Sequence, residues 1–415
     1  MSNNLLPTYS EALACRACSE PRLQETLNLG SQALSGVFPI FDQPDPISGP
    51  LVLGLCMNCG LVQLLHSFPS ELMYGENYGY RSGLNGSMVK HLQRKALRLF
   101  NENNLTRDSV VLDIGSNDGT LLNALIGTGA QLYGMDPTSK KFAEFYASEV
   151  HRVEDFFSST AFLSVSKQAD LIFSIAMFYD LDDPVGFVEQ ISTSLKPNGV
   201  WHFEMSYLPS MLDSNSFDTI CHEHVEYYSM KSLDFILTRA GMRIIDVELN
   251  DINGGSLAVT ACKSSSAREP KKVVDWLRSS ENRRFGNFLE ELQLFVKRVE
   301  IQRVNIQTLL KTIKESGFSI WGVGASTKGN VLLQYCGLDN NIIDAIADVN
   351  EFKFGRVTPG THIPIKSEEE MYIANPGYAL VLPWHFKNTI VGRSEKYLDS
   401  GGRLIFPLPM LSIVE

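Results

Sequence analysis

The sequence predicts an α/β protein in which a small cysteine-built module precedes two Rossmann-like units, each with a doubly wound parallel sheet. The first observation is an apolar run, a glycine-bearing turn and a helical pattern at residues 110–122, which the chain repeats at residues 318–330. The second is that another apolar run ending in an acid follows each turn, at Asp136 and Asp348. The third is a pair of C-x-x-C motifs near the N-terminus. Because ligands of open α/β sheets bind at the carboxyl ends of the strands, we expect functional residues in the two turns.

The composition is that of a globular protein with two or three domains, since 44% of the 415 residues are hydrophobic and 20% are charged. A formal net charge of −11 argues against nucleic acid or an anionic membrane surface as the main partner, although a local basic pocket could still hold a phosphate. The N-terminus has neither a basic nor an apolar signal region, and no run of about 18 apolar residues could span a membrane. We therefore expect a cytoplasmic protein, with a monomer favoured.

Four cysteines form two knuckles in the first part of the chain, Cys15 with Cys18 and Cys56 with Cys59. Four thiolates suit tetrahedral zinc with no open position, so the pattern predicts a structural metal site. A module of residues 1–75 buries too little apolar surface to fold securely alone, and the metal would supply much of its folding free energy. Two redox C-x-x-C motifs or two disulfides are the alternatives, and the expected reducing compartment argues against both.

Residues 74–83 are rich in tyrosine and glycine and lack a clean helical or strand period. Aromatic clusters usually serve packing, but tyrosines among glycines in a polar segment are more typical of a functional loop. The segment is therefore expected to be a functional loop. Residues 88–99 then carry apolar side chains at helical spacing and lead into the first glycine turn.

The first turn differs from the dinucleotide fingerprint G-x-G-x-x-G, because Gly119 comes four residues after Gly115 and Asp113 precedes both. Glycines let the backbone approach a ligand closely, and the following helix start points its amide hydrogens at that ligand. A carboxylate at this place would repel a pyrophosphate but attract a cation. The pattern therefore favours S-adenosylmethionine, whose sulfonium and ammonium are positive. Any other doubly wound domain with a glycine turn is the alternative.

The central unit, residues 76–264, is therefore expected to have the class I methyltransferase fold, with a further buried strand at residues 169–175. Asp136 is placed to bind the ribose hydroxyls, Asp155 to bind the adenine amino group and Phe156 to contact the ring. The predicted cofactor-binding residues are Asp113, Gly115, Asn117, Gly119, Asp136, Pro137, Asp155 and Phe156.

A second group of chemically active side chains, His222, Glu223 and His224, lies in the polar and aromatic stretch of residues 217–229. The two histidines share a face if the segment is extended. One interpretation is a polar loop whose histidines cap neighbouring groups, and another is a metal pair, although H-E-H is not H-E-x-x-H. The third is a general base oriented by an adjacent carboxylate. Residues 253–256 follow a strand-like run and could bring backbone amides against a substrate.

Together, the cysteine knuckles, the tyrosine loop, residues 113–119, the H-E-H stretch and residues 253–256 resemble the sugar C-methyltransferases that act on nucleotide-linked 4-keto-6-deoxyhexoses. The layout of that family covers essentially the whole chain: a zinc-binding module, a methyltransferase core and a C-terminal Rossmann-like domain. The resemblance implies that His224 is the base that removes the C3 proton, with Glu223 beside it and Tyr78 near the sugar.

Two positions depart from the family pattern. The family member that makes tetronitrose has a tyrosine where Cys221 stands and a histidine that aligns with Met177. These departures bear on the sugar and the nucleotide, and not on the class of reaction.

The end of the chain is expected to be a helical linker, residues 265–316, and a second Rossmann-like domain, residues 317–415. The linker is charged and periodic, which predicts one or two long amphipathic helices. The second glycine turn is not a Walker motif, because Asn330 stands where the lysine should be. Even so, Lys328 and the amides at the helix start could receive a diphosphate. A purely structural duplicate is the alternative.

Together with the resemblance to the sugar C-methyltransferases, the sequence implies an S-adenosylmethionine-dependent enzyme of deoxysugar biosynthesis that methylates C3 of a nucleotide-linked 4-keto-6-deoxysugar. A 4-keto group acidifies the C3 hydrogen, so His224 could form an enolate whose carbon attacks the methyl group, while nearby donors stabilise the oxyanion. The alternatives are an O- or N-methyltransferase, an NAD-dependent sugar oxidoreductase and a zinc-dependent scaffold. The predicted substrate-binding residues are Tyr80, His222, Asn253, Gly254, Lys328, Trp384 and His385.

Overall fold

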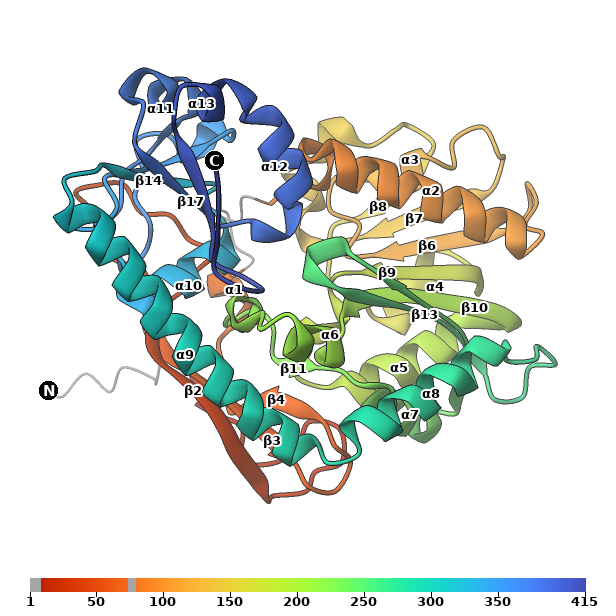
Figure 1. Cartoon of the computed structure of the whole chain (residues 1–415). Coiled ribbons are helices and arrows are strands. Elements are labelled where there is room, and N and C mark those ends of the chain that lie inside the picture. The colour runs from red at the N-terminus through yellow and green to blue at the C-terminus, as the bar shows by residue number, and fades with distance from the viewer. Residues whose placement is uncertain (1–8, 74–79) are drawn as a thin grey trace, which may run out of the picture.

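The computed structural model describes residues 9–73 and 80–415. Three parts of the chain, each built around its own sheet, meet at a central junction (Figure 1). One cluster of buried apolar side chains runs from the N-terminal sheet through residues 208–225 of the central domain to the C-terminal sheet. Because this core is continuous, side chains from all three parts can contribute to one site.

The central domain is a seven-stranded sheet in the order β12-β13-β10-β9-β6-β7-β8. Neighbouring strands from β10 to β8 are parallel, whereas β13 runs antiparallel to both β10 and β12. This order, with a reversed strand inserted beside the last parallel one, confirms the predicted class I methyltransferase fold. The strands are β6 Val110–Ile114, β7 Gln131–Met135, β8 Val150–Val153, β9 Ala169–Ile175, β10 Leu195–Ser206, β12 Met242–Asn250 and β13 Ser256–Lys263.

Helices cover both faces of this sheet, because successive side chains of a strand point to opposite faces. On β6, Val111 joins the apolar cluster under α2 (Gly86–Glu102), whereas Leu112 joins the cluster under α5 (Pro184–Ser194). The helix predicted at residues 88–99 is therefore confirmed as α2. The other helices of the domain are α3 Thr120–Asn123, α4 Ser159–Val165, α6 Leu208–Asp213 and α7 Met230–Arg239.

The N-terminal module is built on an antiparallel sheet in the order β11-β4-β3-β2. Its edge strand β11 (Glu226–Tyr227) comes from the central part of the sequence and pairs with β4 (Val62–Leu64). The sheet of the module therefore includes a strand from beyond the boundary predicted at residue 75. The remaining elements are β1 Ser10–Glu11, β2 Leu23–Ala33, β3 Ser48–Cys56, β5 His66–Ser67 and α1 Ser70–Met73.

The C-terminal domain has a six-stranded sheet in the order β16-β15-β14-β17-β18-β19, parallel except for the last pair. In chain order this is the 3-2-1-4-5-6 arrangement of a Rossmann domain. The strands are β14 Ile320–Val323, β15 Ala345–Asp348, β16 Ile365–Ser367, β17 Tyr378–Val381, β18 Arg403–Phe406 and β19 Ser412–Val414. The helices are α10 Thr327–Cys336, α11 Glu368–Ala374, α12 Lys387–Arg393 and α13 Glu395–Asp399.

The predicted amphipathic linker is confirmed as two helices, α8 (Lys272–Phe285) and α9 (Phe288–Glu315). The break lies at Gly286, after which Asn287 caps α9 by accepting a hydrogen bond from Glu290 N at 3.4 Å. α9 passes β2 and reaches the C-terminal domain (Figure 1), with its buried residues three or four positions apart. Among the described residues, no helix is both long and apolar enough to cross a membrane.

Candidate functional site

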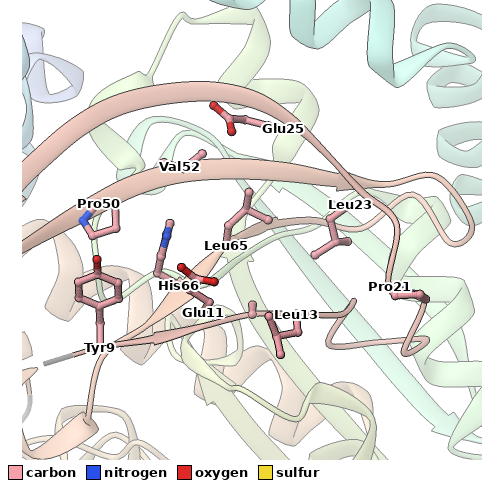
Figure 2. Close-up of a pocket in the computed structure, with 11 residues that line it drawn as sticks. Tyr9, Glu11, Leu13, Pro21, Leu23, Glu25, Pro50, Val52, Leu65 and His66 are labelled. Carbon is pink, nitrogen blue, oxygen red and sulfur yellow. The ribbon is translucent and has the colours of Figure 1, made fainter. Parts of the chain in front are cut away.

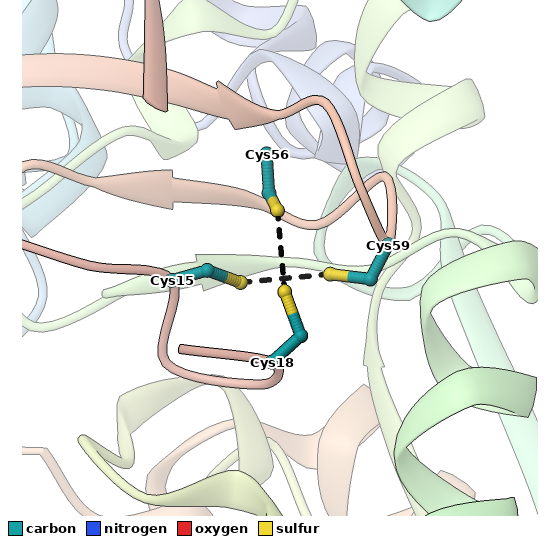
Figure 3. Close-up of side chains that lie close together, drawn as sticks. All are labelled: Cys15, Cys18, Cys56 and Cys59. Carbon is teal, nitrogen blue, oxygen red and sulfur yellow. Dashed lines mark hydrogen bonds between the residues drawn. The ribbon is translucent and has the colours of Figure 1, made fainter. Parts of the chain in front are cut away.

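Two knuckles bring the four cysteines into one cluster (Figure 3). Cys15 Sγ lies 3.5 Å from Cys59 Sγ, and Cys18 Sγ lies 3.5 Å from Cys56 Sγ, with all four sulfurs within 4.8 Å of one another. A disulfide would need about 2.05 Å, whereas four sulfurs each about 2.3 Å from a central zinc have separations close to these. The donor set fits a closed tetrahedral zinc site, which leaves no open position for a substrate.

The first glycine turn leaves β6 with Gly115 and Gly119 both in the left-handed region, at φ +72° and +75°. A Cβ at Gly115 would lie 3.2 Å from Met177 Cγ, and one at Gly119 would lie 2.8 Å from the Tyr146 ring. Any side chain at either position would be both strained and crowded, so this turn requires glycine. The apolar helix expected next is short, since α3 has four residues and a glycine-rich turn follows it.

Three carboxylates, Asp113, Asp118 and Asp136, surround this turn and are buried. Burial raises the pKa of Asp113, and the negative charges of Asp136 and Asp118 raise it further. Asp136 Oδ2 accepts a hydrogen bond from Asn117 N at 2.8 Å, and its Oδ1 accepts from Thr138 N and Oγ1 at 2.6 Å. A sulfonium or an ammonium would relieve this concentration of buried negative charge, so the turn fits S-adenosylmethionine.

The end of the tyrosine loop is hydrogen-bonded to the same turn. Asn117 Nδ2 donates to Tyr80 O at 3.2 Å, and Ser82 N donates to Asn117 Oδ1 at 2.9 Å. The side chain of Tyr80 is about half exposed. Tyr78 lies outside the described residues, so its proposed place near the sugar stays a prediction.

The other predicted adenosine contacts lie at the surface. Pro137 and Asp155 are exposed, and Phe156 is 54% exposed. Asp155 Oδ1 accepts a hydrogen bond from Phe156 N at 2.7 Å. All three follow the carboxyl ends of β7 and β8, at the edge of the sheet where the glycine turn lies. Their contacts with adenine stay predictions.

His224 lies in a turn between η5 (Phe217–Thr219) and β11. Its Nδ1 donates to Thr219 O at 2.9 Å, which leaves Nε2 as the acceptor of a neutral ring. The ring packs against that of Tyr179, with centroids 4.3 Å apart. Burial lowers the pKa of His224 to about 4, and the positive charge of Lys328 contributes to the same shift. At neutral pH, His224 is therefore an unprotonated base.

Glu223 lies where the three parts of the molecule meet. A Cβ on Gly36 of the N-terminal module would lie 2.6 Å from Glu223 Oε1 and 3.9 Å from Thr327 Oγ1 of the C-terminal domain. Among the described residues, the buried Glu223 Oε2 has no hydrogen-bond partner. Burial raises the pKa of this carboxyl group. When it holds a proton, a carboxyl group can donate a hydrogen bond to a ligand oxygen.

The two histidines would share a face only in an extended segment, and residues 220–225 are not a strand but contain a turn at residues 222–223. His222 is fully buried, its Nε2 donates to Gly49 O at 3.2 Å, and its ring packs edge-on against Phe68. Burial lowers the pKa of His222 to about 4. This place against the N-terminal module favours a packing role over the predicted substrate contact.

Side chains of the C-terminal domain close the other side of the junction. Lys328 Nζ donates to Asn253 O at 2.6 Å. A Cβ on Gly254 would lie 3.6 Å from the Trp384 ring and 3.9 Å from His385 Cβ. The structure thus brings together five predicted substrate-binding residues from two domains.

Asp218 was not selected from the sequence, yet it belongs to this junction. Its Oδ2 accepts a hydrogen bond from Trp384 Nε1 at 2.8 Å, and burial raises its pKa. Burial and the charge of Lys328 lower the pKa of His385 to about 3. The available signal was an acid four residues before His222 in the same polar stretch.

A second buried charged cluster was also missed. Glu204 of β10 pairs with His91 at 2.8 Å and Lys95 at 2.9 Å, both on α2, and accepts a hydrogen bond from Asn250 Nδ2 at 2.9 Å. Asn250 is the last residue of β12, three residues before Asn253. The cluster therefore ties α2 to the β12–β13 turn that reaches the junction. An acid near the carboxyl end of a buried strand was the signal in the sequence.

The N-terminal module also has a groove of about 460 Å³ between its first residues and the sheet (Figure 2). None of the residues that line this groove is a predicted site residue. Its lining includes Tyr9, Glu11, Leu13, Leu23, Glu25 and His66.

Three family models match consecutive parts of the chain. Residues 15–74 match a family described as "Putative zinc binding domain", and residues 88–247 match "Methyltransferase domain". Residues 251–409 match "C-methyltransferase C-terminal domain".

Among curated proteins, the chain is 29% identical over 402 residues to the C-methyltransferase NovU of Streptomyces niveus, an alignment that covers 95% of each chain. It is 30% identical over 129 residues to the ubiquinone biosynthesis O-methyltransferase of Histophilus somni, which covers 29% of this chain and 51% of that relative. The chain therefore spans about half the length of this second relative.

Among solved structures, the chain matches an S-adenosylmethionine-dependent methyltransferase from Clostridium acetobutylicum with a TM-score of 0.35 and 16% identity, covering 42% of this chain and 92% of that one. It also matches the Burkholderia thailandensis 1,6-didemethyltoxoflavin-N1-methyltransferase, with a TM-score of 0.34 and 16% identity over 44% and 82% of the two chains.

The strand order, the glycine turn with its acids, the cysteine cluster and the family models agree with one another. The chain is an S-adenosylmethionine-dependent methyltransferase of the class I fold with an N-terminal zinc-binding module.

Proposed function

We propose that this protein transfers a methyl group to C3 of a nucleotide-linked 4-keto-6-deoxysugar. The observation that carries the proposal is a neutral, partly buried histidine, His224, beside a carboxyl group at the junction of three domains. The similarity to a C-methyltransferase over 95% of the chain supports transfer to carbon. Methyl transfer to carbon requires a base that removes the C–H proton. Transfer to a hydroxyl or an amine depends less on such a base.

His224 is suited to remove the C3 proton. Its Nδ1–H is held by Thr219 O at 2.9 Å, so the free electron pair is on Nε2. The 4-keto group acidifies the neighbouring C–H bond, and loss of the proton to Nε2 leaves an enolate. The ring of Tyr179 limits how the imidazole can turn.

Glu223 is suited to stabilise the enolate oxygen. Its Oε2 is buried without a hydrogen-bond partner among the described residues, and burial raises its pKa. In its protonated form this carboxyl group would donate a hydrogen bond to a developing oxyanion without adding negative charge of its own.

One loop links the glycine turn to His224. Met177 lies against Gly115 of the glycine turn, and Tyr179, two residues later, lies against His224. When bound beside Asp113 and Asp136, S-adenosylmethionine would supply an electrophilic methyl group for the C3 carbon of the enolate. Asp113 and Asp136 then provide the negative surroundings that favour the charged cofactor over its neutral product.

The diphosphate of the substrate is assigned to Lys328 and His385. The charge of Lys328 lowers the pKa of both His224 and His385. A bound diphosphate would neutralise that charge, and the pKa of His224 would then rise towards a range in which it accepts a proton more readily. Substrate binding would thereby strengthen the base.

The test is hydrogen exchange at C3 of nucleotide 4-ketosugars, incubated in heavy water with enzyme and S-adenosylhomocysteine and followed by mass spectrometry. Wild-type protein should exchange C3 hydrogen for deuterium, and His224→Ala should reduce that rate by at least about 100-fold. The exposed His151→Ala should not change it. Methylation of an oxygen or nitrogen of the same substrates, with full activity in His224→Ala, would replace this proposal with O- or N-methyl transfer.

A further inference from the structure

We propose that the zinc module is a positioning element for the His224 turn and that Arg16, between the cysteines of the first knuckle, is the positioning residue. The inference rests on the proposed function of His224. It assigns the module a second role beyond its own stability.

The second knuckle is joined to the exit of the His224 turn by sheet pairing. β4 begins three residues after Cys59 and pairs with β11 in the register Val62 with Tyr227 and Gln63 with Glu226. Leu64 N also donates to Val225 O at 2.8 Å. Because Val225 directly follows His224, the backbone of the base is held by the strand that leaves the zinc site.

The first knuckle is joined to the same strand by Arg16, whose side chain is 5% exposed. Its Nη1 donates to Leu64 O at 2.6 Å, and its Nη2 donates to His66 O at 3.2 Å and Ser67 Oγ at 2.7 Å. Its backbone N donates to Gln63 Oε1 at 2.9 Å. One guanidinium therefore fixes the far end of β4 relative to the metal ligands.

Arg16 also reaches the opposite flank of His224. Its Nε donates to Asp182 Oδ1 at 3.2 Å, and Ser67 Oγ donates to the same oxygen at 2.5 Å. Asp182 lies three residues after Tyr179, whose ring packs on His224 and whose carbonyl accepts from Val225 N at 2.9 Å. Both supports of the imidazole are thus attached to the knuckles.

The number and directions of these hydrogen bonds explain why arginine is needed. A guanidinium presents five N–H groups in a fixed plane, whereas an ammonium has three and no plane. By contrast, the hydrogen bonds that shape the glycine turn involve Asn117, Thr138 and Ser82, and none of the described residues 9–73 of the module takes part in them. Loss of Arg16 or of zinc should therefore loosen the His224 turn and leave cofactor binding intact.

The test compares Arg16→Met with Arg22→Met in the full-length protein. Arg22 belongs to the same module but has an exposed side chain that pairs only with Glu20 among the described residues. Amide hydrogen exchange should become on the order of tenfold faster in peptides covering residues 61–68 and 222–228 of Arg16→Met alone. Zinc content by elemental analysis and S-adenosylmethionine affinity by calorimetry should match the wild type in both variants.

A second variant guards against general unfolding of Arg16→Met. Asp182→Ala removes a carboxylate that is 67% exposed and should accelerate amide exchange in residues 177–182 and at Val225 without loss of zinc. Unchanged exchange at residues 222–228 in Arg16→Met, or an equal change in Arg22→Met, would overturn the inference. The amide exchange could change as expected although the wild-type protein does not exchange the C3 hydrogen of any substrate. That result would overturn the proposed function but keep the positioning of the His224 turn by Arg16.

Discussion

The first turns of the two Rossmann-like domains are built alike and differ in the charges around them. In the central domain, Asp136 Oδ2 accepts from Asn117 N at 2.8 Å, and in the C-terminal domain Asp348 Oδ2 accepts from Ala325 N at 2.7 Å. In both, the acid that ends the second strand holds the turn after the first. The shared geometry follows from the shared fold.

The charges separate the two turns. The equivalent glycines at the ends of the two first strands are Gly115 and Gly324, and two residues earlier the central domain has Asp113 and the C-terminal domain has Gly322. Lys353 Nζ lies 3.3 Å from Asp348 Oδ2, whereas burial and neighbouring acids raise the pKa of Asp113. The central turn therefore suits a cation, and the C-terminal domain instead directs Lys328 to the junction. Similar backbones thus serve different ligands because a few side chains set the local charge.

Zinc removal should have the largest effect. It should act on the His224 turn and not on the glycine turn of the central domain. Cys56→Ser should lose the metal, whose binding contributes roughly 10 kcal/mol to the folding of small zinc peptides. The N-terminal module and the His224 turn should loosen, while calorimetry should still detect S-adenosylmethionine binding at the central turn. Elemental analysis that finds no zinc in wild-type protein purified without chelator would contradict the metal assignment.

Removal of the two equivalent acids, Asp136 and Asp348, should have different effects on cofactor affinity. Asp136→Ala should weaken S-adenosylmethionine binding by about 1.5 to 3 kcal/mol, the usual value of a charged hydrogen bond. Asp348→Ala should leave that affinity unchanged, because its carboxylate is paired with Lys353. Calorimetry on both variants measures the difference, and equal losses would show that the cofactor is not confined to the central turn.

Lys328→Met should affect the sugar nucleotide and the pH profile. The KM of the sugar nucleotide should rise about tenfold through loss of a charged contact, with cofactor affinity unchanged. The charge of Lys328 helps to hold the pKa of His224 at about 4, so its removal should raise that pKa. Since the base is active when unprotonated, the acidic limb of kcat/KM should move to higher pH. If the acidic limb does not move, the charge of Lys328 does not affect the pKa of the base.

Asp113→Asn should have the smallest effect. It should raise the stability of the protein and lower its affinity for S-adenosylmethionine. The folded state raises the pKa of Asp113, so its stabilising contribution is present below the pKa of the unfolded chain and is lost as pH rises. At pH 7 the asparagine variant without cofactor should therefore resist urea better than the wild type. Its S-adenosylmethionine affinity should fall about tenfold, the scale of one charged interaction. A gain in both properties would mean that the acid does not face the cofactor.

Local chemistry explains which features could be predicted. The cysteine knuckles, the two glycine turns and the helix at residues 88–99 depend on spacing and on backbone freedom within short segments. The geometry of His224 and His222 could not be predicted in this way. A strand would have placed both on one face, but the turn at residues 222–223 separates them.

By itself, the sequence determined the fold class, the zinc ligands and the acidic character of the cofactor turn, because each follows from residue types at short separations. Only the tertiary structure decided that β11 completes the zinc module and that Asp218 meets Trp384 across 166 residues. It also decided that Lys328 depresses the pKa of His224. These contacts depend on how three separate sheets pack on one continuous core, and such packing leaves no periodic signal along the chain.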